Sequence, residues 1–242
     1  MIHSTSRQLS RFALSIALFL TAYCLSHAQA VITWGTPTFI SGDADVVAVD
    51  TRIWAYNFGD VSKSPVVNGV TFTGYNSNTG NSHFTLTTVG SSIHQNTWAF
   101  AASNNDFNAL SSNYQDLLRS ATYWSGMTNH TQIMTLQDLT VGATYQIQFW
   151  VNDSRAGYHN SDIVTFFDTH GNTATLLYGT TIGQYVTGTF TAADTTQIIN
   201  LGPYSPQINA ATLGLVAVPE PATYAAIIGA LALGLVVLRR RK

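Results

Sequence analysis

The sequence predicts an all-β body: an antiparallel β-sandwich of the jelly-roll type that carries one short helix. Three observations support this fold class. Short runs rich in threonine, valine, isoleucine and aromatic residues alternate between apolar and polar positions, as half-buried strands do. Glycine, asparagine and aspartate separate these runs at short intervals, as in sandwiches. Apolar residues follow a helical spacing in one central segment, and no internal repeat indicates a propeller or solenoid.

The strands expected in the body occur at short, regular intervals. They cover residues 31–33 with 36–40, 45–49, 52–58, 66–73, 84–89, 132–136, 144–151, 163–167, 173–178, 184–190, 197–201 and 210–216. Turns are expected at residues 42–45, at residues 139–142 and at Asn68-Gly69, a strong hairpin signal between apolar runs. Over residues 107–123, apolar side chains recur every three or four positions, which predicts a short amphipathic helix against one end or face of the sheets.

Charge is scarce and unevenly distributed. Charged residues make up 9% of the 242-residue chain, whereas soluble domains average about 25%. The hydrophobic fraction of 45% is ordinary, so the composition excludes charge-driven disorder. Residues 31–217 contain eleven aspartates, four Lys/Arg residues and no glutamate. This acidic body has no basic cluster, which argues against a nucleic-acid partner.

Residues 1–30 have the composition of a secretory signal peptide. Arg7 and Arg11 give a positive start, and residues 12–20 form an apolar stretch of the expected length. Ala28-Gln29-Ala30 supplies the small residues of a cleavage site, so we expect the cut after Ala30; a cut after Ala28 and an uncleaved anchor are the alternatives. Cleavage removes Cys24, the chain's single cysteine, which leaves a body without thiols or disulfides.

Residues 218–242 differ from the body in composition and in charge. Pro219, Glu220 and Pro221 precede an uncharged stretch at residues 222–238, which is long enough for a short transmembrane helix. Four cations then end the chain: Arg239, Arg240, Arg241 and Lys242. Because dense positive charge stays on the cytoplasmic side, the body is expected outside the membrane.

This end resembles the PEP-CTERM sorting signal of Gram-negative bacteria, which has a Pro-Glu-Pro triplet, a short apolar helix and an arginine-rich terminus in that order. The resemblance implies an exosortase as partner, a membrane cysteine protease-transpeptidase that recognises Pro219, Glu220 and Pro221 and removes the segment beyond them. It also implies an inner-membrane intermediate. An ordinary single-pass anchor is the alternative.

The body is similar to galactose-binding-like and carbohydrate-binding jelly rolls over most of residues 31–217. The similarity is carried by residues 40–46, by residues 67–72 and, above all, by residues 139–155, where a Leu-Thr-x-Gly turn leads into an alternating strand. It implies a sandwich and extracellular polysaccharide as a binding partner.

A candidate ligand-binding cluster follows the strand at residues 144–151. Sugar recognition combines an aromatic face with planar polar groups, and this region holds both in Trp150, Asn152, Asp153, Arg155 and Tyr158. Strand alternation puts Trp150 on the more polar face with Gln146 and Gln148, which favours exposure. The alternative is a sandwich edge in which Asp153 pairs with Arg155 and Trp150 belongs to the core.

Calcium is the one cofactor that the sequence suggests. Asp43, Asp45 and Asp50 lie close together in the chain, and Ca²⁺ prefers clustered oxygen ligands. The spacing is not that of an EF-hand, and a turn capped by its own aspartates is the alternative. The histidines of the body show no metal-binding spacing.

These observations predict a structural or adhesive protein of the cell surface or extracellular biofilm matrix; the composition fits both glycan binding and an inert matrix protein. A glycan hydrolase is the alternative from another class. Because the body has no glutamate, its paired carboxylates would have to be aspartates such as Asp153 and Asp162. No serine-hydrolase motif occurs, so we expect no enzymatic activity.

Overall fold

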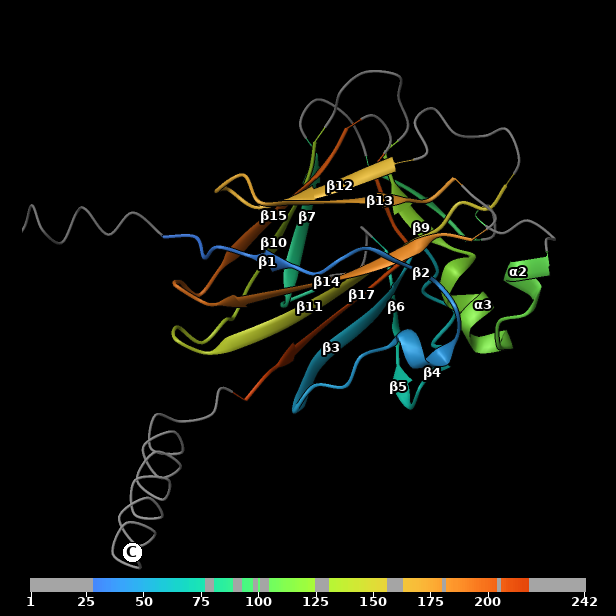
Figure 1. Ribbon diagram of the computed structural model, residues 1–242, viewed down its shortest axis with the longest axis horizontal. Helices are drawn as coiled ribbons and strands as arrows, with labels where there is room; N and C mark the ends of the chain where they lie inside the picture. The colour runs from blue at the N-terminus through green and yellow to red at the C-terminus, as the bar shows by residue number, and fades with distance from the viewer. Residues whose placement is uncertain are drawn as a thin grey trace, which may run out of the picture.

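Two β-sheets packed face to face form the body of the protein, which confirms the all-β sandwich (Figure 1). The computed structural model describes residues 28–76, 81–88, 93–97, 100, 105–124, 131–155, 163–179, 182–203 and 206–217. The predicted signal peptide lies outside these ranges up to residue 27. Residues 218–242, with the Pro-Glu-Pro triplet, the apolar stretch and the basic tail, also lie outside them.

The larger sheet has seven strands in the order β1-β14-β11-β17-β3-β6, with β2 also beside β14. Its pairs are antiparallel except β3 with β6, which is parallel. The strands are β1 (Thr33–Trp34), β2 (Thr38–Phe39), β3 (Thr51–Phe58), β6 (Thr73–Tyr75), β11 (Thr144–Val151), β14 (Gln184–Thr191) and β17 (Ala210–Leu215).

The second sheet has five antiparallel strands in the order β13-β12-β15-β10-β7. They are β7 (Phe84–Thr88), β10 (Gln132–Leu136), β12 (Ile163–Phe167), β13 (Thr173–Leu177) and β15 (Gln197–Gly202). Two small sheets complete the described strands: β4 (Val66–Val67) with β5 (Val70–Thr71), and β8 (His94–Asn96), β9 (Ala121–Tyr123) and β16 (Gln207–Ile208).

Eight strands interleave between the two large sheets in the order of a jelly roll. In chain order they are β3, β10, β11, β12, β13, β14, β15 and β17. With these numbered one to eight, the larger sheet runs one-eight-three-six and the smaller sheet two-seven-four-five. This order results from two Greek keys folded across two sheets. The remaining strands β1, β2, β6 and β7 extend the edges.

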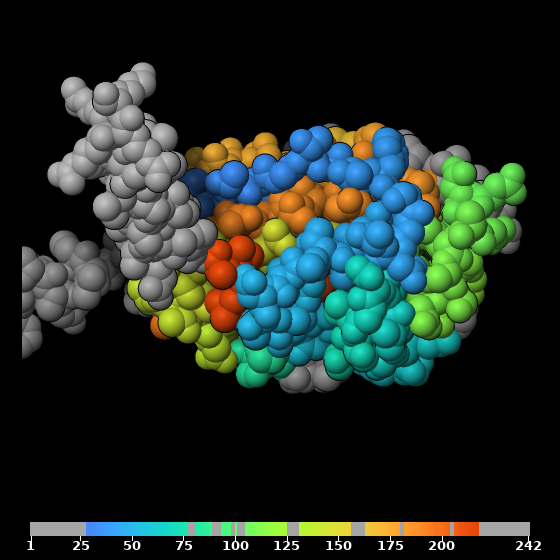
Figure 2. Space-filling view, turned by 60° about the horizontal axis from the view of Figure 1, so that its bottom comes forward, coloured from blue at the N-terminus to red at the C-terminus, as the bar shows by residue number. Residues whose placement is uncertain are grey.

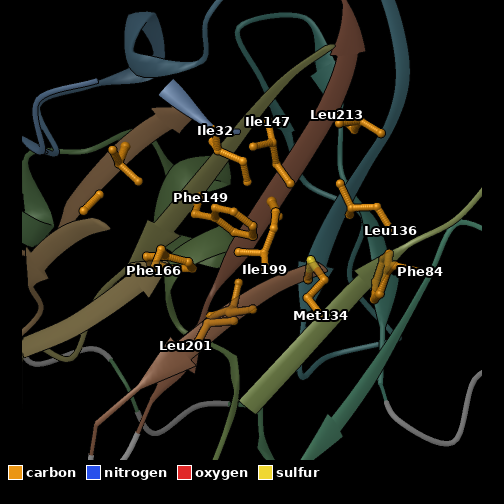
Figure 3. Close-up of a cluster of buried hydrophobic side chains, with 14 of the residues drawn as sticks. Ile32, Phe84, Met134, Leu136, Ile147, Phe149, Phe166, Ile199, Leu201 and Leu213 are labelled. Atoms are coloured by element: carbon orange, nitrogen blue, oxygen red, sulfur yellow. The ribbon is translucent and has the colours of Figure 1, made fainter. Parts of the chain in front are cut away.

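The main core lies between the sheets. Every second residue of β11, including Ile147 and Phe149, points into it, as the alternation predicts. Phe149 stacks on Phe166 of the opposite sheet with ring centroids 4.4 Å apart. Figure 3 shows these side chains meeting those of Met134 and Ile199 from the second sheet. Burial of this apolar surface is the main stabilising contribution in a body without disulfides.

A second core covers the outer face of the larger sheet at one end. Two short helices, α2 (Asn105–Asn108) and α3 (Ser112–Leu118), the β4–β5 hairpin and residues 40–46 pack there. Figure 2 shows the N-terminal segments in blue and teal lying across this face, with the green helical segment at one end. β11 is therefore buried on both sides over its C-terminal half.

The prediction of one helix over residues 107–123 is wrong, because the segment forms α2, α3 and β9. Ser111 begins a new helix: its hydroxyl accepts the Tyr114 backbone N–H at 3.2 Å and caps α3. Residues 121–123 then pair with β8 and β16. The apolar spacing instead reflects burial against the second core, to which Phe107, Leu110 and Tyr114 contribute.

The strand expected over residues 45–49 is also absent. Asp43–Asp45 forms a 3₁₀ turn, η1, and residues 46–50 join no sheet. The side chain of Gln148 takes the place of a partner strand: its amide donates to the Asp45 carbonyl at 2.7 Å, and its carbonyl accepts the Val47 N–H at 3.2 Å.

Both ends of the described chain lie at the same end of the sandwich (Figure 1). At the start, Ala30 is hydrogen-bonded to Gln197, the first residue of β15. At the finish, Val216 donates to the Thr144 carbonyl at 3.0 Å, at the first residue of β11. The turn that leads into β11 bonds to the turn before β15, through Leu139 N–H to Thr195 at 2.9 Å. The helices occupy the opposite end, where β11 finishes.

Candidate functional site

Trp150, the aromatic residue of the candidate ligand-binding cluster, is fully buried at 0% exposure, so the expectation that it is exposed is wrong. The alternation along β11 is as predicted, but the polar face is covered by α3 and its neighbours. The Trp150 indole N–H donates to the Tyr114 hydroxyl at 2.8 Å, and Phe72 contacts the indole edge-on at 5.7 Å between centroids. The ring therefore presents no face on which a sugar could stack.

The Tyr114 hydroxyl is also hydrogen-bonded to Asp45. It donates to Asp45 Oδ2 at 3.0 Å, and the same carboxylate accepts the Ser41 N–H and hydroxyl, each at 2.7 Å, and the Gly42 N–H at 3.0 Å. Burial, reinforced by the negative charge of Asp45, raises the pKa of Tyr114 well above its ordinary value. The phenol therefore keeps its hydrogen and acts as a fixed donor.

Asn152 and Asn209 together hold the C-terminal end of α3. Both side chains are fully buried. Asn209 donates to the Leu118 carbonyl at 2.9 Å, and Asn152 donates to the same oxygen at 3.3 Å. Helix ends leave such carbonyls without an intrahelical partner. Asn209 Oδ1 also accepts the Asn152 N–H at 2.7 Å, so the two amides form one network. Nothing in the sequence around Asn209 indicates this role.

Asp153 and Arg155 are the members of the cluster that the structure brings together as a pair. Arg155 Nε and Nη2 donate to the two oxygens of Asp153, each at 2.7 Å, and the guanidinium lies 4.8 Å from the centre of the Phe100 ring. The Asp153 side chain is 4% exposed and that of Arg155 26%, so only the arginine reaches solvent. Tyr158 and Asp162 lie outside the described residues.

The structure does not bring the three aspartates of the candidate calcium site together. Asp45 is bonded as above, Asp43 accepts the Ser111 hydroxyl at 2.6 Å, and Asp50 accepts the Ala217 N–H. Within the described ranges, no group of three or more His, Cys, Asp or Glu residues is placed to hold a metal ion. The turn-capping alternative accounts for the contacts of Asp45.

Asp168, which the sequence analysis did not single out, joins the two sheets. Its carboxylate accepts the Ile32 N–H at 2.9 Å, next to β1, as well as the His170 N–H and the backbone and side-chain N–H groups of Asn172. Burial by itself raises the pKa of Asp168, but these hydrogen bonds outweigh it and hold the pKa below its usual value. Gly171-Asn172 is typical of a turn, so the sequence indicates the contacts of Asp168 with Asn172 but not the contact with Ile32.

Comparison with known families identifies the C-terminal segment. Residues 217–242 match the model of the PEP-CTERM protein-sorting motif. The match indicates an exported protein that passes through a membrane-anchored intermediate and is processed by an exosortase, as the sequence predicts. Among the helices of the described ranges, none combines the length and the apolar composition needed to span a bilayer.

The body aligns with solved structures only at low identity. The ANX2 ectodomain from Arabidopsis thaliana has a TM-score of 0.41 and 13% identity over 69% of this chain and 50% of that one. For the enzymatically active domain of tailspike protein 4 from bacteriophage CBA120, the TM-score is 0.34, with 15% identity over 56% and 20% of the two chains. A carbohydrate-binding module of the β-sandwich superfamily has a TM-score of 0.22 and 10% identity over 78% and 98%.

These similarities carry no argument about activity. This chain spans about half the length of the ANX2 ectodomain and a fifth of the tailspike domain. No curated protein matches its sequence.

Proposed function

We propose that this chain is a structural or adhesive protein of a Gram-negative bacterium, which reaches the cell surface or the extracellular biofilm matrix after an exosortase removes the segment beyond Pro219, Glu220 and Pro221. The single observation that carries the proposal is the match of residues 217–242 to the sorting motif. Before processing, residues 222–238 hold the chain in the inner membrane and the basic tail stays on the cytoplasmic side.

The contacts inside the body support a structural role. The polar side chains of the candidate cluster bond to one another and to the backbone: Trp150 to Tyr114, Asn152 to the end of α3, and Asp153 to Arg155. The first two of these contacts fasten α3 to the larger sheet. We include in the proposal that the body has no enzymatic activity, since the Asp153 carboxylate is bound by Arg155 at both oxygens and no observation favours a hydrolase.

Glycan binding is the finer part of the proposal. The body has few charges and many hydroxyl and amide side chains, which can hydrogen-bond to polysaccharide without electrostatic attraction. With Trp150 buried, the region in question is the rim after β11, where Arg155 reaches solvent and the chain continues to Tyr158. We include calcium in the proposal as an accessory ion, without assigning ligands to it, because the structure does not bring Asp43, Asp45 and Asp50 together.

The processing claim is tested on the full chain expressed in a Gram-negative host with its exosortase. Mass spectrometry of the mature protein is expected to find a C-terminus at or near residues 219–221. Replacing all three motif residues by alanine should leave Lys242 in place and keep the protein in the membrane fraction. Thr223→Ala, just beyond the triplet, is the matched control and should be processed normally. Lys242 on the wild-type protein would overturn the claim.

A glycan array probed with the processed protein, with and without calcium, tests the finer claim. Binding that Arg155→Gln weakens supports recognition at the rim after β11. Binding that depends on calcium supports the accessory ion. An array without any signal would remove glycan binding and leave the structural role.

A further inference from the structure

We propose that the signal peptide is removed between Ala28 and Gln29, so that the mature protein begins at Gln29 rather than at Val31. The proposal rests on the export described under the proposed function, and it reverses the preference of the sequence for a cut after Ala30. Its basis is the set of contacts that Gln29 and Ala30 make in the folded body.

Ala30 belongs to the folded body. It is 7% exposed and packs in the main core between the sheets. Its N–H donates to Gln197 Oε1 at 2.8 Å, and its carbonyl accepts from Gln197 Nε2 at 3.2 Å. Gln197 is itself 1% exposed, and its amide donates to the Ile198 carbonyl at 3.1 Å in addition to the Ala30 carbonyl. A cut after Ala30 would remove the donor that Oε1 of this glutamine has in the folded body, together with the acceptor of its amide.

Gln29, the residue before Ala30, is also hydrogen-bonded to the start of β15. Its side-chain carbonyl accepts the Ile198 N–H, and its amide lies 3.5 Å from the Thr196 carbonyl. The contacts of Gln29 and Ala30 thus run along the start of β15 and lead directly to Ile32, which Asp168 holds. Ala28 is exposed and marks the point at which the chain leaves the body.

The sequence before this point suits a signal peptidase as well as the later site does. Ser26 and Ala28 place small residues at the first and third positions before the Ala28–Gln29 bond, as Ala28 and Ala30 do for the next site. The reaction is hydrolysis by the host enzyme. One water molecule is consumed, the Ala28–Gln29 amide bond breaks, and Ala28 gains a carboxylate while Gln29 gains an α-amino group.

The N-terminus of the mature protein, purified from the exporting host, tests the proposal. Mass spectrometry should find Gln29, or its pyroglutamyl form lighter by one ammonia. A protein that begins at Val31 would overturn the proposal and leave export intact. A protein that still begins at Met1 in the cytosol would overturn both this proposal and the proposed function.

Two variants separate the competing bonds. Ser26→Glu alters only the site before Gln29, and the Gln29 terminus should be lost. Ala30→Leu alters the residue before the Ala30–Val31 bond and leaves Ser26 and Ala28 in place, so the Gln29 terminus should persist. Because signal peptidase acts on the unfolded chain, this result does not depend on how well the Ala30→Leu variant folds. The opposite pattern in the two variants would assign the cut to Ala30–Val31.

Discussion

The Trp150 indole donates to the Tyr114 hydroxyl at 2.8 Å, and this contact joins the outer face of the larger sheet to α3. Both side chains are fully buried. Since the hydroxyl also donates to Asp45, a chain of three side chains crosses the second core and ends at the η1 turn. Each member of the chain depends on the next for a hydrogen-bond partner.

Tyr114→Phe should lower the free energy of unfolding by about 1–3 kcal/mol, because the buried indole N–H and the Asp45 carboxylate each lose a partner. Urea unfolding of the processed protein, followed by tryptophan fluorescence, measures this change. Tyr185→Phe is the matched control: Tyr185 lies beside the same indole, with 6.4 Å between ring centroids, but is partly exposed. Equal effects of the two substitutions would contradict the role of the hydroxyl.

Asp168→Asn should destabilise the protein by about 1–3 kcal/mol at neutral pH, because an amide cannot accept all the hydrogen bonds of the carboxylate. The pKa of Asp168 is lower in the folded than in the unfolded state. Its stabilising contribution is therefore present above the unfolded-state pKa of about 4 and is lost as the pH falls through the folded-state pKa. The wild type and the variant should therefore converge in stability as the pH falls below about 4. Unfolding curves at several pH values measure this, and a difference that stays constant would argue against the carboxylate.

Arg155→Met should cost about 1–3 kcal/mol, because it leaves the Asp153 carboxylate buried without its cation. In a double-mutant cycle with Asp153→Asn, the double variant should lose less than the two single variants combined. The more exposed pair of Lys63 and Asp116, 3.0 Å apart, is the comparison, and Lys63→Met there should cost about 0–1 kcal/mol. Additive effects of Asp153→Asn and Arg155→Met would show that the two side chains do not act as a unit.

Local sequence signals were sufficient for the long strands of the two large sheets and for one hairpin. β11 has the predicted bounds, residues 144–151, because a turn precedes its alternating residues and the polar residues 152–154 follow them. The hairpin at Asn68-Gly69 forms as expected, with φ of 49° and 76° at these residues. Such features depend only on neighbours in the chain, which is why they could be predicted.

The candidate cluster could not be assigned correctly from sequence, because its environment is set by distant segments. The outer face of β11 looked exposed from alternation alone. Whether a face meets water depends on what covers it, and here α3 and residues 40–46 do so. Trp150 is therefore a core residue, and the partners of Asn152 come from residues 31 or more positions away. The ion pair of Asp153 with Arg155 lies within three residues, so the sequence alone indicates it as an alternative to a binding site.

The position of the two chain ends has a consequence for orientation. The Ala217 N–H donates to the Asp50 carboxylate. Only Val218 lies between Ala217 and Pro219, so these two residues can be at most about 7 Å apart. In the membrane-anchored intermediate, the end of the sandwich at which β11 starts is therefore the end to which the sorting segment is joined. The opposite end, with α3 and Arg155, is separated from that attachment by the length of the sandwich, so we expect it to be the end that a neighbour outside the cell can approach most easily.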